Sequence, residues 1–269
     1  MNVYTLRQIP SEAQIQKYIR RIVFGKNTFC PVCKGRDSVY SVQARYRCRK
    51  CKLRFSLLSH TWLSNMKLPL QEFWLLLWCW TKQVPVKQTE AFTNLSEKGV
   101  RHWFEQLRDH LPEDQELLEH MVQLDEAYFG GRKGYALLMG KEPGTRKLAY
   151  HIFPHTMPTK YDAVEFLTMY VKPYSKLFTD GGSIYTNIDN IYPVEHTIDI
   201  HKKFEFTNTS EIEGMFGVLR TFIRRMYHHT TYDKFPSLMC EFYFRFSRPE
   251  IFESPYEYLL NTLRLVPTR

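Results

Sequence analysis

Four cysteines near the start of the chain have the spacing of a metal site. Cys30 and Cys33 form one C-x-x-C pair, Cys48 and Cys51 form a second, and fourteen residues separate the pairs. Such pairs suit tetrahedral zinc, because each C-x-x-C turn presents two sulfurs to one ion and a short hairpin brings the two turns together. The sequence therefore predicts one structural Zn²⁺ bound by these four thiolates, with free thiols or disulfides as the alternative.

A second set of residues that could do chemistry is acidic. Asp125 lies within the apolar segment 121–128, Asp180 ends a short apolar segment just before two glycines, and Glu211 and Glu213 open a long helical pattern. Carboxylate oxygens are the ligands that Mg²⁺ prefers, and two such ions about 4 Å apart can activate the attacking oxygen and stabilise the leaving oxygen in phosphodiester displacement. Two aspartates at strand ends and one glutamate on a facing helix are sufficient to hold such a pair of ions.

The choice between the two glutamates depends on a nearby cation. Glu211 and Glu213 are chemically equivalent, but Arg220 lies seven residues after Glu213, two turns along the same helical face. A cation placed there could contact the phosphate of a substrate held by the metals. Each acid also has an ordinary alternative, because Asp180 before Gly-Gly is a common turn signal and Glu213 could be a solvated helix residue.

The elements that would position these acids form an alternating series. Apolar segments at 121–128, 148–153, 175–180 and 194–200 are typical of strands, and helical patterns cover 162–171 and 210–226. In the last of these, apolar residues recur at i, i+3, i+4, i+7 and i+11, which indicates an amphipathic helix. The order of strands and helices predicts a mixed α/β domain.

The region between the cysteines and this domain is helical in pattern. A buried helix is expected over 71–82, a second over 86–92, and a third after Ser96, a suitable N-cap. Two short helices across a tight turn are compatible with helix-turn-helix DNA binding. A helical linker is an equally good interpretation, because residues 61–120 carry 6 basic and 9 acidic residues, which does not favour phosphate contact.

The positive charge of the chain is concentrated at its N-terminal end. Residues 1–60 carry 13 Lys/Arg and 2 Asp/Glu, against 24 and 26 in residues 61–269, and the whole chain has a net charge of +9. Such a cluster favours a nucleic-acid partner, although a solvated basic surface is the alternative. The residues predicted to contact DNA surround the second cysteine pair: Arg45, Arg47, Arg49, Lys50, Lys52 and Arg54.

A membrane or secretory location is not expected. The longest apolar run, 73–80, has eight residues where about twenty are needed to cross a bilayer. The first residues also lack the apolar core of a signal peptide. We therefore expect a cytoplasmic protein that is associated with the nucleoid when it is bound to DNA.

Several short motifs occur in an order that is characteristic of a known family. They are DEAYFGGR at 125–132, TDG at 179–181 and TSEIEG at 209–214, the last leading to Leu219-Arg220 and to Tyr227-His228-His229. Together with the cysteine pairs, this set resembles the transposases of ISXO-type insertion sequences, which are relatives of the eukaryotic Merlin elements. These are DDE transposases with an RNase H-like catalytic core and an N-terminal zinc ribbon.

The resemblance implies specific roles. Asp125, Asp180 and Glu213 would bind two Mg²⁺ or Mn²⁺ ions, and Arg220 would stand where the family usually has lysine, which keeps the charge. The implied fold is α/β, with a mixed sheet flanked by helices. The expected domains are a zinc ribbon over 1–60, a helical region over 61–115 and a catalytic domain with C-terminal helices over 116–269.

The resemblance also implies the reaction and the partners. The protein would bind the terminal inverted repeats of an insertion sequence as a homodimer or larger synaptic assembly, cleave the DNA strands and transfer them to target DNA. Two other hypotheses stay open from the sequence. One is a non-catalytic DNA-binding regulator derived from a transposase, and the other is a metal-dependent nuclease without strand transfer.

Overall fold

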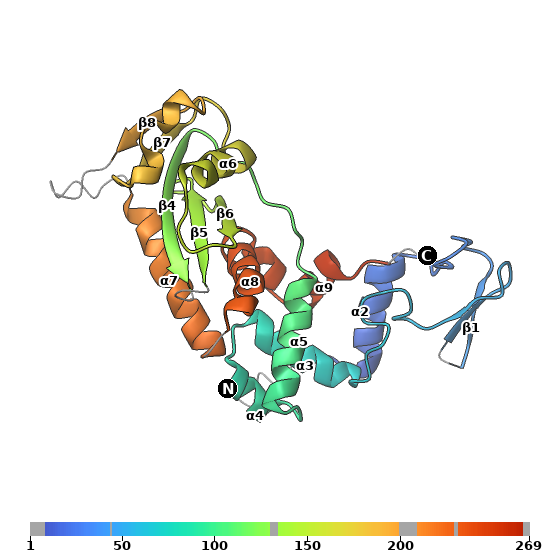
Figure 1. The fold of residues 1–269 in the computed structure, drawn as a ribbon. Coiled ribbons are helices and arrows are strands. Elements are labelled where there is room, and N and C mark those ends of the chain that lie inside the picture. Colours follow the sequence, from blue (N-terminus) through green and yellow to red (C-terminus); the bar gives the residue numbers. More distant parts are fainter. Residues whose placement is uncertain (1–8, 44, 130–133, 199–208, 229–230, 266–269) are drawn as a thin grey trace. The chain divides into compact units, whose positions relative to one another are not determined.

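The computed structural model describes residues 9–43, 45–129, 134–198, 209–228 and 231–265 (Figure 1). The segment 130–133 and His229, which belong to the motifs above, lie outside the described residues. The chain divides into two compact units, one formed by Met1–Phe104 with Glu250–Arg269 and the other by Glu105–Pro249.

The first unit begins with helix α2 (Glu12–Phe24), which the sequence analysis did not predict. Ser11 caps this helix, because its side chain accepts from the backbone N–H of Gln14 while the Gln14 side chain accepts from the Ser11 N–H. Ile15, Ile19 and Val23 recur at four-residue spacing and are buried. The helix therefore buries its apolar face against the rest of the unit, and its opposite face is exposed to solvent.

A small antiparallel sheet follows, with the order β1-β2-β3. Its strands are β1 (Val39–Val42), β2 (Arg45–Cys48) and β3 (Arg54–Phe55). Tyr46 and Phe55 are paired across β2 and β3 and stack with ring centroids 5.3 Å apart. Phe24 of α2 lies 6.1 Å from each of these rings, so one face of the sheet is covered by aromatic packing.

In its described residues, the first unit contains three further helices and the beginning of a fourth. They are α3 (Leu70–Thr81), α4 (Val86–Phe92), α5 (Glu97–Asp109), which runs on into the second unit, and α9 (Pro255–Thr262). The helices expected after 71, 86 and 96 are thus present, and Ser96 accepts from the Gly99 N–H at 3.3 Å as the expected cap. DNA binding by α4 and α5 stays a prediction.

The C-terminal segment packs within this first unit. Trp80 of α3 is fully buried and lies 5.3 Å from the ring of Phe252 and 5.1 Å from that of Tyr258, measured between ring centroids. Glu250–Arg269, which the sequence analysis placed in the catalytic domain, therefore belongs to the compact unit that contains the zinc ribbon.

The second unit is built on a five-stranded mixed sheet with the order β6-β5-β4-β7-β8. Its strands are β4 (Met121–Phe129), β5 (Tyr135–Lys141), β6 (Leu148–Phe153), β7 (Lys176–Thr179) and β8 (Glu195–Ile198). The first three form an antiparallel meander, and β7 and β8 run parallel to β4. With helices α6 (Lys160–Tyr170), α7 (Ser210–Tyr227) and α8 (Phe235–Ser247), this is an RNase H-like α/β core, as predicted.

The two faces of β4 pack on different helices. Val122 and Leu124 belong to a buried cluster with Phe166 of α6. Gln123 points to the other face, because side chains alternate along a strand, and its Oε1 accepts from the backbone N–H of Ile212 at 3.0 Å. Helix α7 therefore lies on the face that carries Gln123 and Asp125.

A buried polar network fixes the far end of α7. The carboxylate of Glu241, which has no exposed surface, accepts hydrogen bonds from Tyr227 at 2.5 Å and from Arg245 Nε at 2.8 Å. Arg108 lies 3.5 Å from the same carboxylate and has its guanidinium 5.0 Å from the centre of the Tyr227 ring. This network joins α5, α7 and α8 within the second unit.

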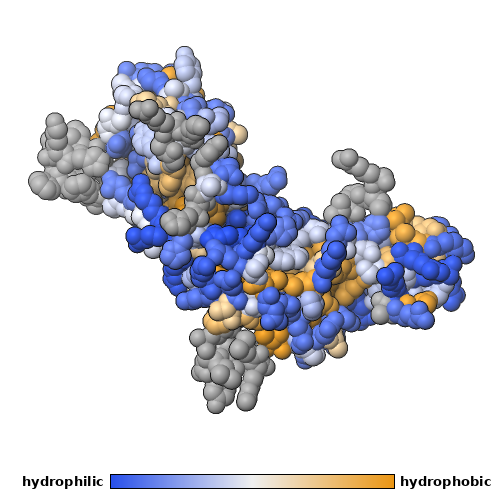
Figure 2. All heavy atoms as spheres, turned by 60° about the horizontal axis from the view of Figure 1, so that its bottom comes forward, coloured by the Kyte–Doolittle hydropathy of each residue, from blue (hydrophilic) through white to orange (hydrophobic). Residues whose placement is uncertain are grey.

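Apolar side chains reach the surface of the protein in several places, as the orange areas of Figure 2 show. Among the described residues, Tyr161 and Tyr174 are the most exposed large apolar side chains, at 86% and 87%. Among the helices that the structure describes, none has the length and apolar character needed to cross a membrane.

Candidate active site and zinc centre

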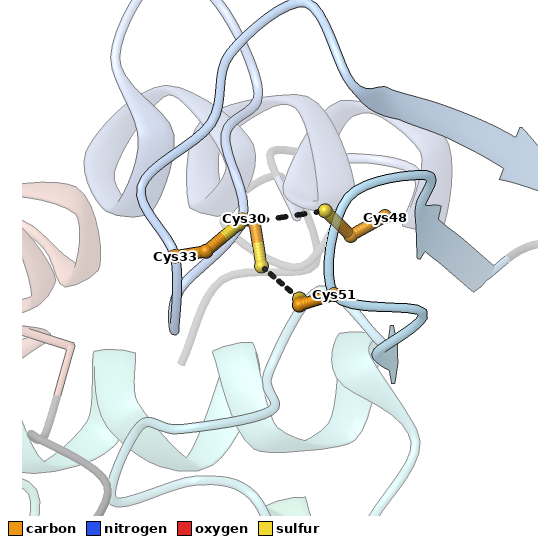
Figure 3. Close-up of side chains that lie close together, drawn as sticks. All are labelled: Cys30, Cys33, Cys48 and Cys51. Carbon is orange, nitrogen blue, oxygen red and sulfur yellow. Dashed lines mark hydrogen bonds between the residues drawn. The ribbon is translucent and has the colours of Figure 1, made fainter.

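The four cysteines of the two C-x-x-C pairs converge in the first unit (Figure 3). The Sγ atoms all lie within 4.8 Å of one another, with Cys30 and Cys51 3.5 Å apart and Cys33 and Cys48 also 3.5 Å apart. A tetrahedral zinc ion with Zn–S bonds of about 2.3 Å separates its sulfurs by about 3.8 Å. The cluster therefore has the dimensions of a structural zinc site.

The two cysteine turns have the same backbone geometry. The N–H of Cys30 donates to the carbonyl of Gly35 at 3.0 Å, and the N–H of Cys48 donates to that of Leu53 at 2.9 Å. The residue after each second cysteine, Lys34 or Lys52, has a positive φ, 57° or 62°. Because non-glycine residues seldom adopt this conformation, the shared geometry shows that both turns are shaped to aim two sulfurs at one point.

The thiols differ in their electrostatic surroundings. Burial raises the pKa of Cys30 to about 12, whereas the hydrogen bond from Ser38 lowers the pKa of Cys48 to about 6. Zinc binds thiolates, so the ion must displace the proton of Cys30 against this burial cost. A divalent cation at the centre of the four sulfurs supplies the compensating charge.

The basic residues predicted to contact DNA lie on and beside the ribbon sheet. Arg47 is paired with Tyr40 of β1 on one side and with Arg54 of β3 on the other, so the three side chains form one row across the sheet. Arg49 stands over the ring of Tyr40 at 5.1 Å. The six predicted residues are Arg45, Arg47, Arg49, Lys50, Lys52 and Arg54. Arg47 is half-buried and the other five are exposed. In the described part of the chain, none of the six has a carboxylate within 4.0 Å.

Asp125 and Asp180 are brought together by strand register. Strands β4 and β7 are parallel, with Met121 opposite Lys176 and Gln123 opposite Phe178. Continuing the same register by two residues places Asp125 opposite Asp180, just beyond the last residue of β7. Residues in register on parallel strands point to the same face, so the two carboxylates meet at the end of β7.

Glu126 joins these two acids, which the sequence analysis did not foresee. A carboxylate oxygen from each of Asp125, Glu126 and Asp180 lies within 4.8 Å of the others. The alternation of side chains along β4 would place neighbours on opposite faces, so the sequence pattern alone gives no reason to group Glu126 with Asp125. Its position is fixed by Tyr185, a fully buried residue whose hydroxyl donates to Glu126 Oε2 at 2.6 Å.

The cluster concentrates negative charge in a partly buried place. Burial raises the pKa of Asp125 to about 7; the backbone N–H of Glu126 opposes this shift, and the charges of Glu126, Asp180 and Glu213 add to it. Burial also raises the pKa of Glu126. The donor set consists of hard carboxylate oxygens, so these residues fit Mg²⁺ or Mn²⁺ better than a soft metal.

The two glutamates at the start of α7 have different surroundings. Glu211 accepts from Lys141 Nζ at 2.6 Å and from the backbone N–H of Gly144 at 3.0 Å, and the lysine lowers its pKa. Glu213 is exposed, accepts from Thr209 Oγ1 at 3.5 Å, and is close enough to Asp125 to influence its pKa. Glu213 is not in the group of three acids within 4.8 Å, so its role as third ligand stays a prediction.

Arg220 lies further along α7 and is exposed. Its guanidinium is 5.9 Å from the ring centre of Phe129, the last residue of β4. The ring of Phe129 in turn stacks on Phe235 at 4.3 Å between centroids. The aromatic pair thus supports the cation near the end of the strand that carries Asp125.

Replacing Lys141 by methionine is expected to destabilise the second unit by about 2–3 kcal/mol. The Lys141 side chain is 5% exposed and its ammonium also donates to the carbonyls of Glu142 at 3.1 Å and Thr145 at 3.0 Å. Methionine would remove the ammonium donor from both carbonyls and from the Glu211 carboxylate, which would keep its contact with the Gly144 N–H. Urea unfolding of the variant against wild type measures the loss.

Glu211→Gln is the matched control for this substitution. It removes the carboxylate charge but leaves both carbonyl contacts of Lys141 in place. We expect a smaller loss, below about 1 kcal/mol, because the Glu211 side chain is 43% exposed. An equal loss in both variants would show that the ion pair, not the carbonyl contacts, holds the start of α7.

Two family models match the chain. The transposase zinc-ribbon domain matches residues 10–54, and the ISXO2-like transposase domain matches residues 116–247. No curated protein matches it. A solved structure of a simian T-cell lymphotropic virus intasome in complex with PP2A regulatory subunit B56 gamma is similar at 13% identity and a TM-score of 0.31, over 50% of this chain and 57% of that one.

The likeness to the intasome chain is too low to support the fold, which rests on the strand order of the sheet. The family models, in contrast, match both parts of the molecule in which the sequence placed chemistry. The first covers the four-cysteine cluster, and the second covers Asp125, Glu126 and Asp180 together with α7. The chain belongs to the IS1595-type transposases with an N-terminal zinc ribbon.

Proposed function

We propose that this protein binds the terminal inverted repeats of an insertion sequence and catalyses metal-dependent DNA strand cleavage and strand transfer. The observation that carries the proposal is the position of Asp125 on β4 and of Asp180 just beyond the end of the parallel strand β7, with their carboxylates in one cluster. Membership of a transposase family supports the same activity. A DNA-acting protein of this kind is expected in the cytoplasm, associated with the nucleoid.

In this proposal the acids of the sheet hold two divalent cations. Asp125 and Asp180 are ligands, and Glu213 completes the set from the first turn of α7. The ions, when bound, activate the attacking oxygen and stabilise the leaving oxygen of the scissile phosphodiester. Glu126, which Tyr185 holds in place, is a further carboxylate of the same cluster.

The remaining residues position the acids and the substrate. The Thr179 hydroxyl contacts His196 Nε2 at 2.8 Å and the Asp180 carbonyl at 2.8 Å, which restrains the backbone of Asp180. Arg220 would contact a substrate phosphate, a role that its planar guanidinium suits because it can bind two phosphate oxygens at once. The chain's own contribution is therefore mainly positioning and charge.

The zinc ribbon would bind DNA. The row formed by Tyr40, Arg47 and Arg54 faces away from the aromatic packing of Tyr46 and Phe55, because residues alternate between the faces of β2. Arginines without carboxylate partners suit phosphate oxygens, which carry most of the affinity in DNA complexes. Joining two element ends to target DNA would require a homodimer or a larger assembly.

The test uses the full chain and a labelled duplex that carries an inverted repeat of an ISXO-type element. With Mg²⁺ or Mn²⁺ we expect cleavage at the element end and joined products with a target duplex, and neither product with EDTA. Binding of the duplex without any metal-dependent cleavage would favour the regulator. Cleavage without joined strands would favour a nuclease.

A further inference from the structure

The ribbon sheet is not the one basic surface among the described residues, because the outward face of α2 is basic too. Lys17, Arg20 and Arg21 are exposed and lie three and four residues apart, opposite the buried residues Ile15 and Ile19. Side chains at such spacing are neighbours on a helix surface. The three cations therefore form one patch, which we call the α2 basic face, and Lys26 lies just beyond the helix end.

In the described part of the chain, no acidic side chain pairs with a cation of this face. Within the described ranges, none of these four cations has a carboxylate within 4.0 Å, whereas Lys87, Lys172 and Lys176 each do. The helix dipole favours cations in the last turn, which accounts for Arg21, but it gives no reason for Lys17 in the middle of the helix. Neighbouring like charges repel each other, so the face is suited to an anionic partner.

Two hollows flank the α2 basic face, and both are lined by Lys17 and Arg20. One, of about 500 Å³, is also lined by Arg21, Lys26 and Tyr256. The other, of about 510 Å³, is also lined by Gln16 and by Ser41, Tyr46 and Ser56 of the ribbon and the segment after it. Among the residues that the structure describes, none of those lining either hollow carries a carboxylate.

The second hollow makes the α2 basic face continuous with the ribbon. Ser41 of β1 is paired with Tyr46 of β2 and reaches the same hollow as Lys17 and Arg20. Lysine, arginine and serine are among the side chains that contact DNA phosphates and sugars. This hollow lies on the Ser41 and Tyr46 face of the sheet, opposite the row of Tyr40, Arg47 and Arg54, so a polyanion bound at α2 would contact a surface separate from that row.

We infer that the α2 basic face is a second phosphate-contacting surface for duplex DNA, on the opposite side of the ribbon sheet from its arginine row. The inference rests on the proposed function, because it assigns this surface to the same partner. The contacts would be to the phosphate backbone, because Lys17, Arg20 and Arg21 supply the positive charge that phosphate oxygens bind.

The test measures duplex binding by fluorescence anisotropy at several salt concentrations, with the full zinc-loaded chain. The variant K17A/R20A/R21A keeps good helix formers in α2. We expect the slope of log K against log salt to fall in magnitude by about 2 to 3, because each phosphate neutralised by the protein accounts for about 0.9 of that slope. The reduction should be the same for duplexes of different sequence.

K147A/K172A/K176A is the matched control, because it removes the same charge from lysines that already have carboxylate partners and lie outside α4 and α5. Its slope should equal that of wild type. An unchanged slope in the α2 variant, an equal fall in the control, or tighter wild-type binding of double-stranded RNA than of DNA would each overturn the inference. Failure of the wild-type chain to bind any duplex would instead refute the proposed function.

K17Q/R20Q/R21Q provides a second variant with the same loss of charge and longer side chains. Zinc content and circular dichroism of both variants should match wild type, because the substituted side chains point away from the buried face of α2. The inference requires that both variants show the same reduction in salt dependence. A reduction in one variant alone would attribute the effect to packing and overturn it.

Discussion

Asp125→Asn is expected to abolish DNA cleavage and strand transfer while leaving DNA binding intact. The carboxylate lies in a cluster with Glu126 and Asp180, and the amide of asparagine offers one neutral oxygen where a divalent cation needs a charged ligand. Loss of metal-based stabilisation worth several kcal/mol corresponds to a rate reduction of about 10³-fold or more. A gel assay with a labelled element end measures cleavage, and anisotropy with the same duplex measures binding.

The same substitution is expected to stabilise the metal-free protein at neutral and higher pH. The pKa of Asp125 is raised from 3.8 to about 7, so between about pH 4 and pH 7 the folded chain holds a proton that the unfolded chain has lost. Stability therefore falls as the pH rises through this window, and the whole cost is present above pH 7. Asparagine removes a cost on the order of 2 kcal/mol, allowing for partial solvation of the carboxylate.

Urea unfolding without metal, at pH 4.5 and at pH 8, tests this effect. Wild type and variant should be close in stability at the lower pH and differ at the higher pH. Glu195→Gln on β8 is the control, since Glu195 has a 70% exposed side chain and pairs with Lys176 at a distance of 3.8 Å. It should change neither cleavage nor the pH dependence. Strand transfer at the wild-type rate by Asp125→Asn would refute the proposed role of this carboxylate.

Much of the second unit could be predicted from local patterns. Strands β4, β6, β7 and β8 and helices α6 and α7 lie close to the expected ranges, because each has an apolar run or a helical repeat of its own. Strand β5 could not be recognised in this way. Its residues Ala136–Met139 are all fully buried, so no alternation marks them, and short apolar runs do not distinguish a central strand from a buried helix.

The acid cluster was predictable in part. Asp125 and Asp180 each end or interrupt an apolar strand, which is a local signal. The position of Glu126 depends on Tyr185, and that of Glu211 depends on Lys141. Both contacts join residues far apart in the sequence, so no spacing rule could reveal them. The same holds for Arg108 and Glu241, whose ion pair exists only once α5 and α8 have packed together.

Helix α2 has local signals that the net charge of residues 1–60 does not contain. Ile15, Ile19 and Val23 recur at helical spacing, and Ser11 with Gln14 forms a capping box. The charge of residues 1–60 therefore has two locations, the ribbon around the second cysteine pair and the outer face of α2. A net charge gives neither location, because it carries no information on which face of an element the side chains lie.

Cys33→Ser is expected to release zinc and unfold the ribbon sheet while the five-stranded sheet of the second unit stays folded. The ribbon strands are two to four residues long, and the main apolar packing of the sheet is formed by Phe24, Tyr46 and Phe55. Zinc binding contributes about 10–16 kcal/mol of folding free energy in comparably small domains, far more than these rings can supply. Zinc analysis and amide hydrogen exchange measure the two effects.

The expected exchange pattern separates the two units of the chain. Amides of β1 and β2 should lose protection in Cys33→Ser, whereas those of β4 and β5 should keep it. Cys79→Ala is the control, because Cys79 is a buried cysteine outside the four-cysteine cluster and its replacement should leave one zinc per chain. One equivalent of zinc and a protected ribbon in Cys33→Ser would contradict the four-thiolate site.

The zinc-free variant also separates binding from chemistry. If the ribbon binds DNA, Cys33→Ser should lose most of the salt-dependent affinity for duplex DNA. The acids of the second unit should keep their geometry, because their positions are fixed by the register of β4 with β7 and by Tyr185, not by the zinc centre. Cys33→Ser should therefore lose DNA binding, but Mn²⁺ should still stabilise its second unit against heat. Asp125→Asn should keep DNA binding, and Mn²⁺ should not stabilise it.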